Sequence, residues 1–262
     1  MNGIVTSIYD HNNDIWGNPQ KYKGINFYPL KLKEQQYKKI FYNLFCFPKN
    51  SIQDKDILKM SYLKFLIIIL AGSNRPELIK DLTSFFQHIT QENKIEILYE
   101  ENKNIKNELS KIILKFIIGE VEFTESEFDN IREIILEQNG TDIDFIEQYN
   151  PELEEKLNTF NKTADTTEFK DEVFAFCSLL GKTILEVSEY TLFQYKAHIE
   201  KLLLLQEYQL YRPLEATGQI TLKKGEIKHF LSGSKKAGRY DSILIGKESF
   251  KNTGDIFKAI NN

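Results

Sequence analysis

The sequence is poor in the residues that build metal sites and disulfide frameworks. Its two cysteines, Cys46 and Cys177, each lie in a short apolar segment, so we expect small core side chains in a reducing compartment. The four histidines are scattered singly along the chain and have no cysteine near them in sequence. A zinc site is therefore not expected. His198 is interpreted as a solvated residue on a helix face.

Long apolar runs are also missing. The most apolar stretch, residues 65–71, is far shorter than the roughly 20 residues that span a bilayer. The N-terminus carries Asp10 and Asp14 and has no apolar run of secretory length. We therefore expect an intracellular protein that contacts no membrane.

Catalytic signatures are missing as well. The chain contains neither a phosphate-binding loop of the type G-x-x-x-x-G-K-[ST] or G-x-G-x-x-G nor a nucleophile turn G-x-S-x-G. Carboxylates are abundant on predicted helix faces, so no pair of them stands out as a general acid and base. We expect no catalytic residue, no cofactor, no metal and no enzymatic activity, with an enzyme of unrecognised type as the less favoured alternative.

The charge is small but unevenly distributed. The formal net charge is −4, which does not indicate nucleic acid or an anionic membrane as a partner. Residues 100–160 hold 16 Asp and Glu against 6 Lys and Arg, whereas residues 219–262 hold 9 Lys and Arg against 4 Asp and Glu. Either these are solvated helix faces and a surface tail, or they are an acidic docking face and a basic arm.

Periodicity predicts mostly helices in the first half of the chain. Apolar residues recur at helical spacing over 37–45 and 57–70, and a further helix is predicted to start at Asn74. Residues 25–32 alternate as in a short strand, with Pro29 at an edge. Residues 95–99 and 112–118 are interpreted as two paired strands, although the second can equally be helical.

Capping signals dominate the second half. Thr124-Glu125-Ser126-Glu127 is a capping box that opens a helix ending at Asn139-Gly140. Asn150-Pro151 opens the next helix, and 169–180 is an apolar segment ending at Gly181. A long helix is predicted from Thr191. Its predicted inner face is Leu192, Tyr195, Ile199, Leu202, Leu203 and Leu210. Beyond Pro213, spaced glycines indicate a mobile tail or small strand region.

These patterns predict a mainly α fold with minor β (α+β), built of helical bundle-like domains with short strands and irregular terminal arms. The predicted division is an N-terminal arm (1–24), an α+β domain (25–119), a helical domain (120–212) and a basic C-terminal arm or small strand region (213–262).

The terminal arms supply the candidate residues for protein interaction. Trp16 is either an anchor folded back on its own core or an anchor into a partner. The candidates are Trp16, Tyr22, Lys235, Lys236, Arg239 and Tyr240. The last four mix cations with an aromatic ring, as a nucleic-acid surface does, but the segment is short and much of the chain is acidic, so nucleic acid is disfavoured.

Two blocks of sequence carry a resemblance to a known family. Residues 123–139 with 149–154 resemble tail and baseplate proteins of contractile-tailed bacteriophages. Residues 190–195, 207–208 and 227–230 are similar to the T-[IL]-x-Q-[FY] helix and basic tail of phage tail morphogenesis proteins. The resemblance implies a non-enzymatic structural or assembly protein of a phage tail baseplate, either a hub component in the virion or its assembly chaperone.

The implied partners are other phage tail or baseplate proteins, met in the virion or in the host cytoplasm during assembly. Pairing of the acidic middle of one copy with the basic tail of another would make a homo-oligomer, an expectation that rests on charge alone. The alternatives are a cytoplasmic tail assembly chaperone absent from the virion and an unrelated helical protein-binding regulator.

Overall fold

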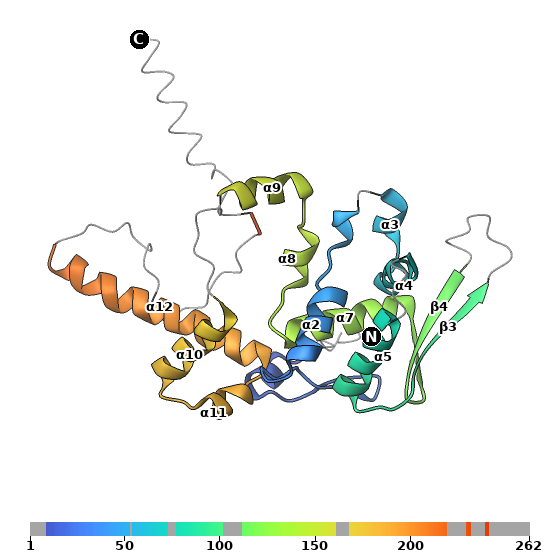
Figure 1. The fold of residues 1–262 in the computed structure, drawn as a ribbon, viewed down its shortest axis with the longest axis horizontal. Helices are drawn as coiled ribbons and strands as arrows, with labels where there is room; N and C mark the ends of the chain where they lie inside the picture. The colour runs from blue at the N-terminus through green and yellow to red at the C-terminus, as the bar shows by residue number, and fades with distance from the viewer. Residues whose placement is uncertain are drawn as a thin grey trace, which may run out of the picture.

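The computed structural model describes residues 9–52, 54–72, 77–101, 112–160, 168–218, 229–231 and 239–240. The fold is mainly α with minor β, as predicted, and Figure 1 shows its arrangement. The helices of the first half are α1 (His11–Trp16), α2 (Gln35–Leu44), the 3-10 turn η1 (Lys49–Ser51), α3 (Lys55–Lys59), α4 (Tyr62–Gly72) and α5 (Glu77–Thr90). Those of the second half are α7 (Glu125–Gln138), α8 (Ile143–Glu147), α9 (Pro151–Phe160), α10 (Phe169–Leu180), α11 (Ile184–Ser188) and α12 (Leu192–Ala216). The strands are β1 (Gln20–Tyr22), β2 (Ile25–Phe27), β3 (Ile95–Glu101), β4 (Ile112–Ile118) and β5 (Val121–Thr124).

The segment predicted as an irregular N-terminal arm is folded over residues 9–24. The Asp10 side chain accepts a hydrogen bond from the Asn12 N–H and starts α1, and Gly17 ends the helix in the left-handed region at φ 68°. β1 and β2 then pair as an antiparallel hairpin. The prediction was wrong here because the start and stop signals enclose a helix of only six residues, which is too short to show a period.

The core is aromatic and lies between α2, α4, α5, α7 and the larger sheet. Phe86 is at its centre, with its ring 4.5 Å from that of Phe116 and 5.8 Å from that of Phe128. The helix predicted after 57–70 is present as α5, and its Leu82, Phe85, Phe86 and Ile89 side chains are buried in the core. The predicted start of this helix at Asn74 lies outside the described residues.

The helix predicted over 57–70 is two helices. Met60 is extended at φ −70° and ψ 154°, and the Ser61 hydroxyl accepts a hydrogen bond from the Lys64 N–H at 3.2 Å. The Tyr62 N–H at the start of α4 donates to the Asp129 carboxylate of α7 at 2.8 Å. A polar residue able to cap a helix therefore interrupts a continuous apolar period.

The larger sheet is antiparallel, in the order β3-β4-β5, so the predicted strands over 95–99 and 112–118 are confirmed. Leu114, Phe116 and Ile118 alternate into the core, while the far half of the β3–β4 hairpin extends from the body at the right of Figure 1. The predicted domain boundary after residue 119 falls at the turn between β4 and β5, where Gly119 has φ 61°.

Helices α10, α11 and α12 form the opposite end of the molecule, at the left of Figure 1. α12 begins with a capping box of Thr191 and Gln194 and is joined to the N-terminal half by backbone bonds, Leu192 N–H to Leu30 O at 2.9 Å and Leu32 N–H to Tyr190 O at 2.8 Å. One cluster of buried side chains accordingly runs from Ile25 to Tyr195.

The long helix differs from its prediction in two respects. It continues through Pro213 to Ala216, so the break expected at Pro213 was wrong. Of its predicted inner face only Leu192 and Tyr195 are buried, whereas Leu203 is 60% exposed and Leu210 59% exposed. The spacing of the leucines predicted the helix correctly. It did not predict how far along the helix other elements bury its side chains.

Candidate functional site

Large apolar side chains reach solvent on α10, α11 and α12. We call these residues the apolar helix surface: Phe169, Phe174, Leu179, Ile184, Leu185, Leu203, Leu210 and Tyr211. The buried side of α10 is a different set, in which Phe176 packs against Tyr190 and Tyr195. Helix α10 thus presents apolar side chains both inward and outward, which an ordinary amphipathic surface helix does not.

The outer part of α12 adds length to this surface. From Leu203 to the end of the helix no side chain is buried. Tyr208 has local contacts, with its ring 5.0 Å from His229 and 5.9 Å from Phe230. The helix therefore extends beyond the core while carrying leucines and tyrosines, which favour contact with another apolar surface.

Trp16 is exposed to solvent beside the N-terminal end of α12. It is 75% exposed at the end of α1, and the preceding Ile15 is 55% exposed. Helix α1 is held against α12 by a hydrogen bond from Gln194 Nε2 to the Ile15 carbonyl at 2.9 Å. The alternative in which Trp16 folds back on its own core was wrong, because the short helix directs its indole outward.

Tyr22 lies inside the structured part of the chain. It ends β1, its ring stacks on Phe123 at 6.0 Å, and its hydroxyl accepts a hydrogen bond from Asn130 Nδ2 at 3.1 Å. Since Tyr22 is partly buried and packed against the core, these contacts explain the residue without a partner.

Arg239 and Tyr240 pack against the corner between α8 and α9. The buried Tyr240 hydroxyl accepts from the Asn150 N–H at 2.6 Å and donates to the Asn150 carbonyl at 3.1 Å. Arg239 forms an ion pair with Glu154, and its guanidinium lies 5.1 Å from the ring centres of Phe145 and Tyr149. Part of the basic segment thus meets the acidic middle within one chain. Lys235 and Lys236 lie outside the described residues.

A pocket of about 570 Å³ lies between α12 and the turn that joins α7 to α8. Lys196 of α12 donates hydrogen bonds to the Asn139 carbonyl at 3.1 Å, the Gly140 carbonyl at 3.0 Å and the Thr141 hydroxyl at 3.1 Å. Burial lowers the pKa of Lys196 to about 8. These three hydrogen bonds indicate that Lys196 caps the C-terminus of α7 as a cation.

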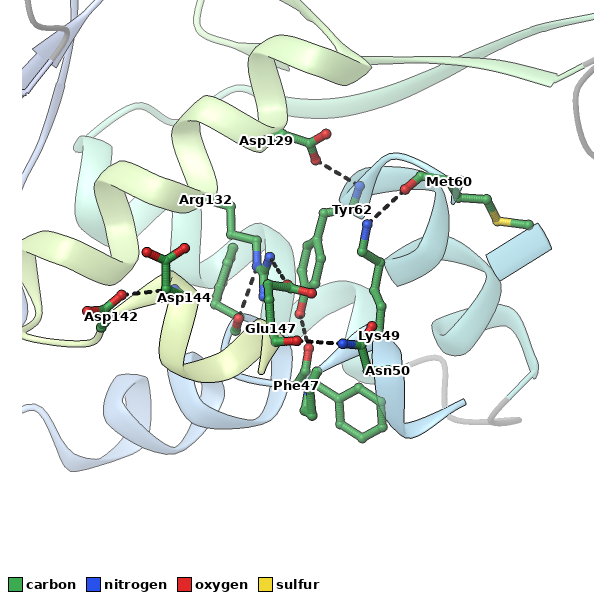
Figure 2. Close-up of polar contacts among 12 residues, drawn as sticks. Phe47, Lys49, Asn50, Met60, Tyr62, Asp129, Arg132, Asp142, Asp144 and Glu147 are labelled. Carbon is green, nitrogen blue, oxygen red and sulfur yellow. Dashed lines mark hydrogen bonds and ion pairs between the residues drawn. The ribbon is translucent and has the colours of Figure 1, made fainter. Parts of the chain in front are cut away.

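Figure 2 shows a second polar cluster, between α7, α8 and the start of α4. The buried Arg132 donates from Nε to the Phe45 carbonyl at 3.2 Å and from Nη1 to Glu147 at 2.8 Å, and its guanidinium carbon lies 3.6 Å from the Tyr62 ring centre. Among the described residues Arg132 Nη2 has no hydrogen-bond acceptor. The Tyr62 hydroxyl donates to the Leu44 carbonyl at 2.7 Å. The cluster joins α7 and α8 to the start of α4.

Within the described ranges, no group of His, Cys, Asp and Glu side chains could hold a metal ion. No described helix is long and apolar enough to cross a membrane. Burial raises the pKa of the Cys46 thiol to about 12, which does not suit a nucleophile.

Comparison with known proteins gives no relatives. No protein-family model matches the chain, and neither a curated protein nor a solved structure does.

Sequence reasoning missed most of the apolar helix surface. A signal was present on α10, where Phe174 stands away from the inner face formed by Val173, Phe176 and Cys177. The exposure of Leu203 and Leu210 gave no such signal, since it depends on where the body of the protein ends.

Proposed function

We propose that this chain acts by docking to other proteins, without catalysing a reaction. The observation that carries the proposal is the apolar helix surface on α10, α11 and α12. Leu185 is 77% exposed and Phe174 is 57% exposed, on helices that the rest of the fold holds in place. Exposed apolar side chains gathered on neighbouring helices are typical of interaction sites, whereas apolar residues scattered singly over a surface are not.

The free energy gained by burying these side chains is large enough to support association with a partner. Fully burying one Leu or Phe side chain contributes roughly 1.5–3 kcal/mol, so covering a few of these side chains offsets much of the entropy lost on association. Trp16 is the most favourable single anchor, because tryptophan buries a large area with few rotatable bonds.

The partners we propose are tail or baseplate proteins of a contractile-tailed bacteriophage. The resemblance over 123–139, 149–154 and 190–195 supports this assignment, and a mainly helical chain with exposed apolar helices is compatible with sequential docking during assembly. The chain is then a baseplate component or an assembly chaperone that is absent from the finished particle.

The docking surface is tested by affinity capture with the full chain. Leu185→Asp and Phe174→Asp place a charge on the surface while leaving the core untouched, and Ile79→Asp on α5 does the same at an exposed apolar position elsewhere. We expect the first two variants to lose the proteins that wild type and Ile79→Asp retain. Equal capture by all four proteins, each shown to be folded by circular dichroism, would refute docking through these helices.

The biological assignment is tested by mass spectrometry of purified particles and infected-cell lysate. A stoichiometric signal in particles identifies a baseplate component, and absence from particles with capture of tail proteins from lysate identifies an assembly chaperone. If neither particles nor captured material contains tail proteins, the assignment is wrong, whereas docking itself is judged by the variants.

A further inference from the structure

The pocket between α12 and the α7–α8 turn combines carboxylates with aromatic rings. Glu137 contributes from the end of α7, Asp142 from the turn and Glu200 from α12, while Phe145 of α8 and Phe193 of α12 supply rings. At about 570 Å³ the pocket lies within the roughly 300–1,000 Å³ of typical ligand sites. This is the chemistry that binds a cation whose flat or methylene part packs on a ring.

The one lysine in the pocket does not cancel this preference. Lys196 Nζ directs its three N–H groups at the Asn139 and Gly140 carbonyls and the Thr141 hydroxyl, at 3.0–3.1 Å. Its charge therefore stabilises the end of α7. With three carboxylates and one ammonium, the charged groups that line the pocket are net acidic.

One arginine of this chain, Arg239, already packs at the edge of the pocket. The Arg239 guanidinium lies 5.1 Å from the ring centre of Phe145, a residue that also lines the pocket. Arg239 donates from Nη1 to the Phe145 carbonyl at 3.4 Å and forms an ion pair with Glu154. A ring face, a carbonyl and a carboxylate thus already hold one guanidinium at the edge of the pocket, along α8.

We propose that the pocket binds a lysine or arginine side chain of a basic segment in a partner protein. The segment runs along α8, where Arg239 occupies the neighbouring position, and its cation enters between Phe145 and Phe193 toward Glu200. This inference rests on the proposed docking function and adds a second contact to it, electrostatic where the apolar helix surface is hydrophobic. The electrostatic contact selects the partner by charge.

The test is fluorescence anisotropy of the full chain with a fluorescein-labelled peptide of alternating arginine and glycine. The variant Glu200→Gln removes one carboxylate from the pocket, and Glu207→Gln removes the same charge two turns further along α12, outside the pocket. Phe193→Leu removes a ring and keeps an apolar wall. We expect Glu200→Gln and Phe193→Leu each to weaken binding roughly five-fold, with Glu207→Gln close to wild type.

Two results would overturn the proposal. If Glu200→Gln and Glu207→Gln weaken binding equally and Phe193→Leu has no effect, the peptide is attracted by net charge alone. If the peptide does not bind but a small diamine such as putrescine raises the melting temperature of wild type and not of Glu200→Gln, the occupant is a small amine. Leu185→Asp is expected to bind the peptide as wild type does, so losing this site and losing the apolar docking surface give different patterns.

Discussion

Arg132 is the most buried cation in the described part of the chain, and its surroundings have to make up for its desolvation. It is 3% exposed and meets one carboxylate, one carbonyl and one ring face (Figure 2). A buried ion pair of this kind contributes little net stability, yet removing one partner leaves the other uncompensated. Helical periodicity predicts an apolar side chain at this position of α7, so the cluster could not be predicted from the pattern.

We expect Arg132→Met to lower the free energy of unfolding by about 3 kcal/mol, because the Phe45 carbonyl loses its donor and Glu147 loses its partner. Urea denaturation measures the change. The matched control is Arg212→Met, which breaks an exposed ion pair with Glu215 on α12 and should change stability by less than about 0.5 kcal/mol. A loss for Arg132→Met no larger than for the control would contradict this account.

Lys196 gives the stability a pH dependence whose sign is opposite to that of an exposed salt-bridged lysine. Its pKa is about 8 in the folded protein and 10.5 ordinarily. Between these values the unfolded chain holds a proton that the folded chain has lost, so this residue makes the protein more stable as pH rises. The Cys46 thiol, whose pKa burial raises to about 12, acts in the opposite direction above about pH 9.

Comparing wild type with Lys196→Met isolates the lysine, since both proteins keep Cys46. We expect stability measured in urea at about pH 9.5, minus that at about pH 7.5, to be on the order of 1 kcal/mol more favourable in wild type than in the variant. Identical pH slopes would mean that Lys196 keeps an ordinary pKa in the folded state.

At the level of single elements, capping chemistry was the most reliable sequence signal. The box at Thr124 is present with both of its reciprocal bonds, and the helix predicted from Thr191 begins there. Such signals are read within four residues, and the same side chains satisfy the same backbone groups whatever the rest of the protein does. The missed break at Met60, in contrast, involves a contact made elsewhere, since the first N–H of α4 donates to Asp129 of α7.

We expect the cap of α12 to contribute more to the free energy of unfolding than an ordinary surface cap does. The buried Thr191 accepts a hydrogen bond from the Gln194 N–H at 3.1 Å, and the next residue donates its backbone bond to Leu30. We expect Thr191→Ala to cost about 1–2 kcal/mol of unfolding free energy. Thr183→Ala removes the same type of box from the exposed start of α11 and is the matched control, with a smaller expected cost. Equal losses would show that attachment to Leu30 adds nothing.

Across the whole molecule, the sequence predicted the fold class and most helices, because periodicity and caps are local. It did not predict which apolar side chains stay uncovered. Phe86 and Phe174 both lie in helices rich in apolar residues, yet one is at the centre of the core and the other is exposed. The difference depends on which elements pack on each helix. Local sequence patterns do not reveal this packing.

Because α7 is buried while the outer part of α12 is exposed, we predict that their backbone amides differ in protection from hydrogen exchange. α7 is packed on several sides and supplies Phe128, Ile131 and Ile135 to the core, whereas α12 has no buried side chain from Leu203 onward. In the isolated chain we expect amides of 203–216 to exchange at least about ten-fold faster than those of α7, because local opening there exposes little apolar area. Exchange followed by mass spectrometry after peptic digestion measures this.

Adding a captured partner protein turns the same measurement into a map of the docking surface. Peptides covering α10, α11 and 203–216 should gain protection, while those of α7 stay unchanged, because burial of the exposed leucines stabilises only the helices that carry them. Protection gained instead over the β3–β4 hairpin, where Tyr99 is 77% exposed, would move the docking surface to the other end of the molecule.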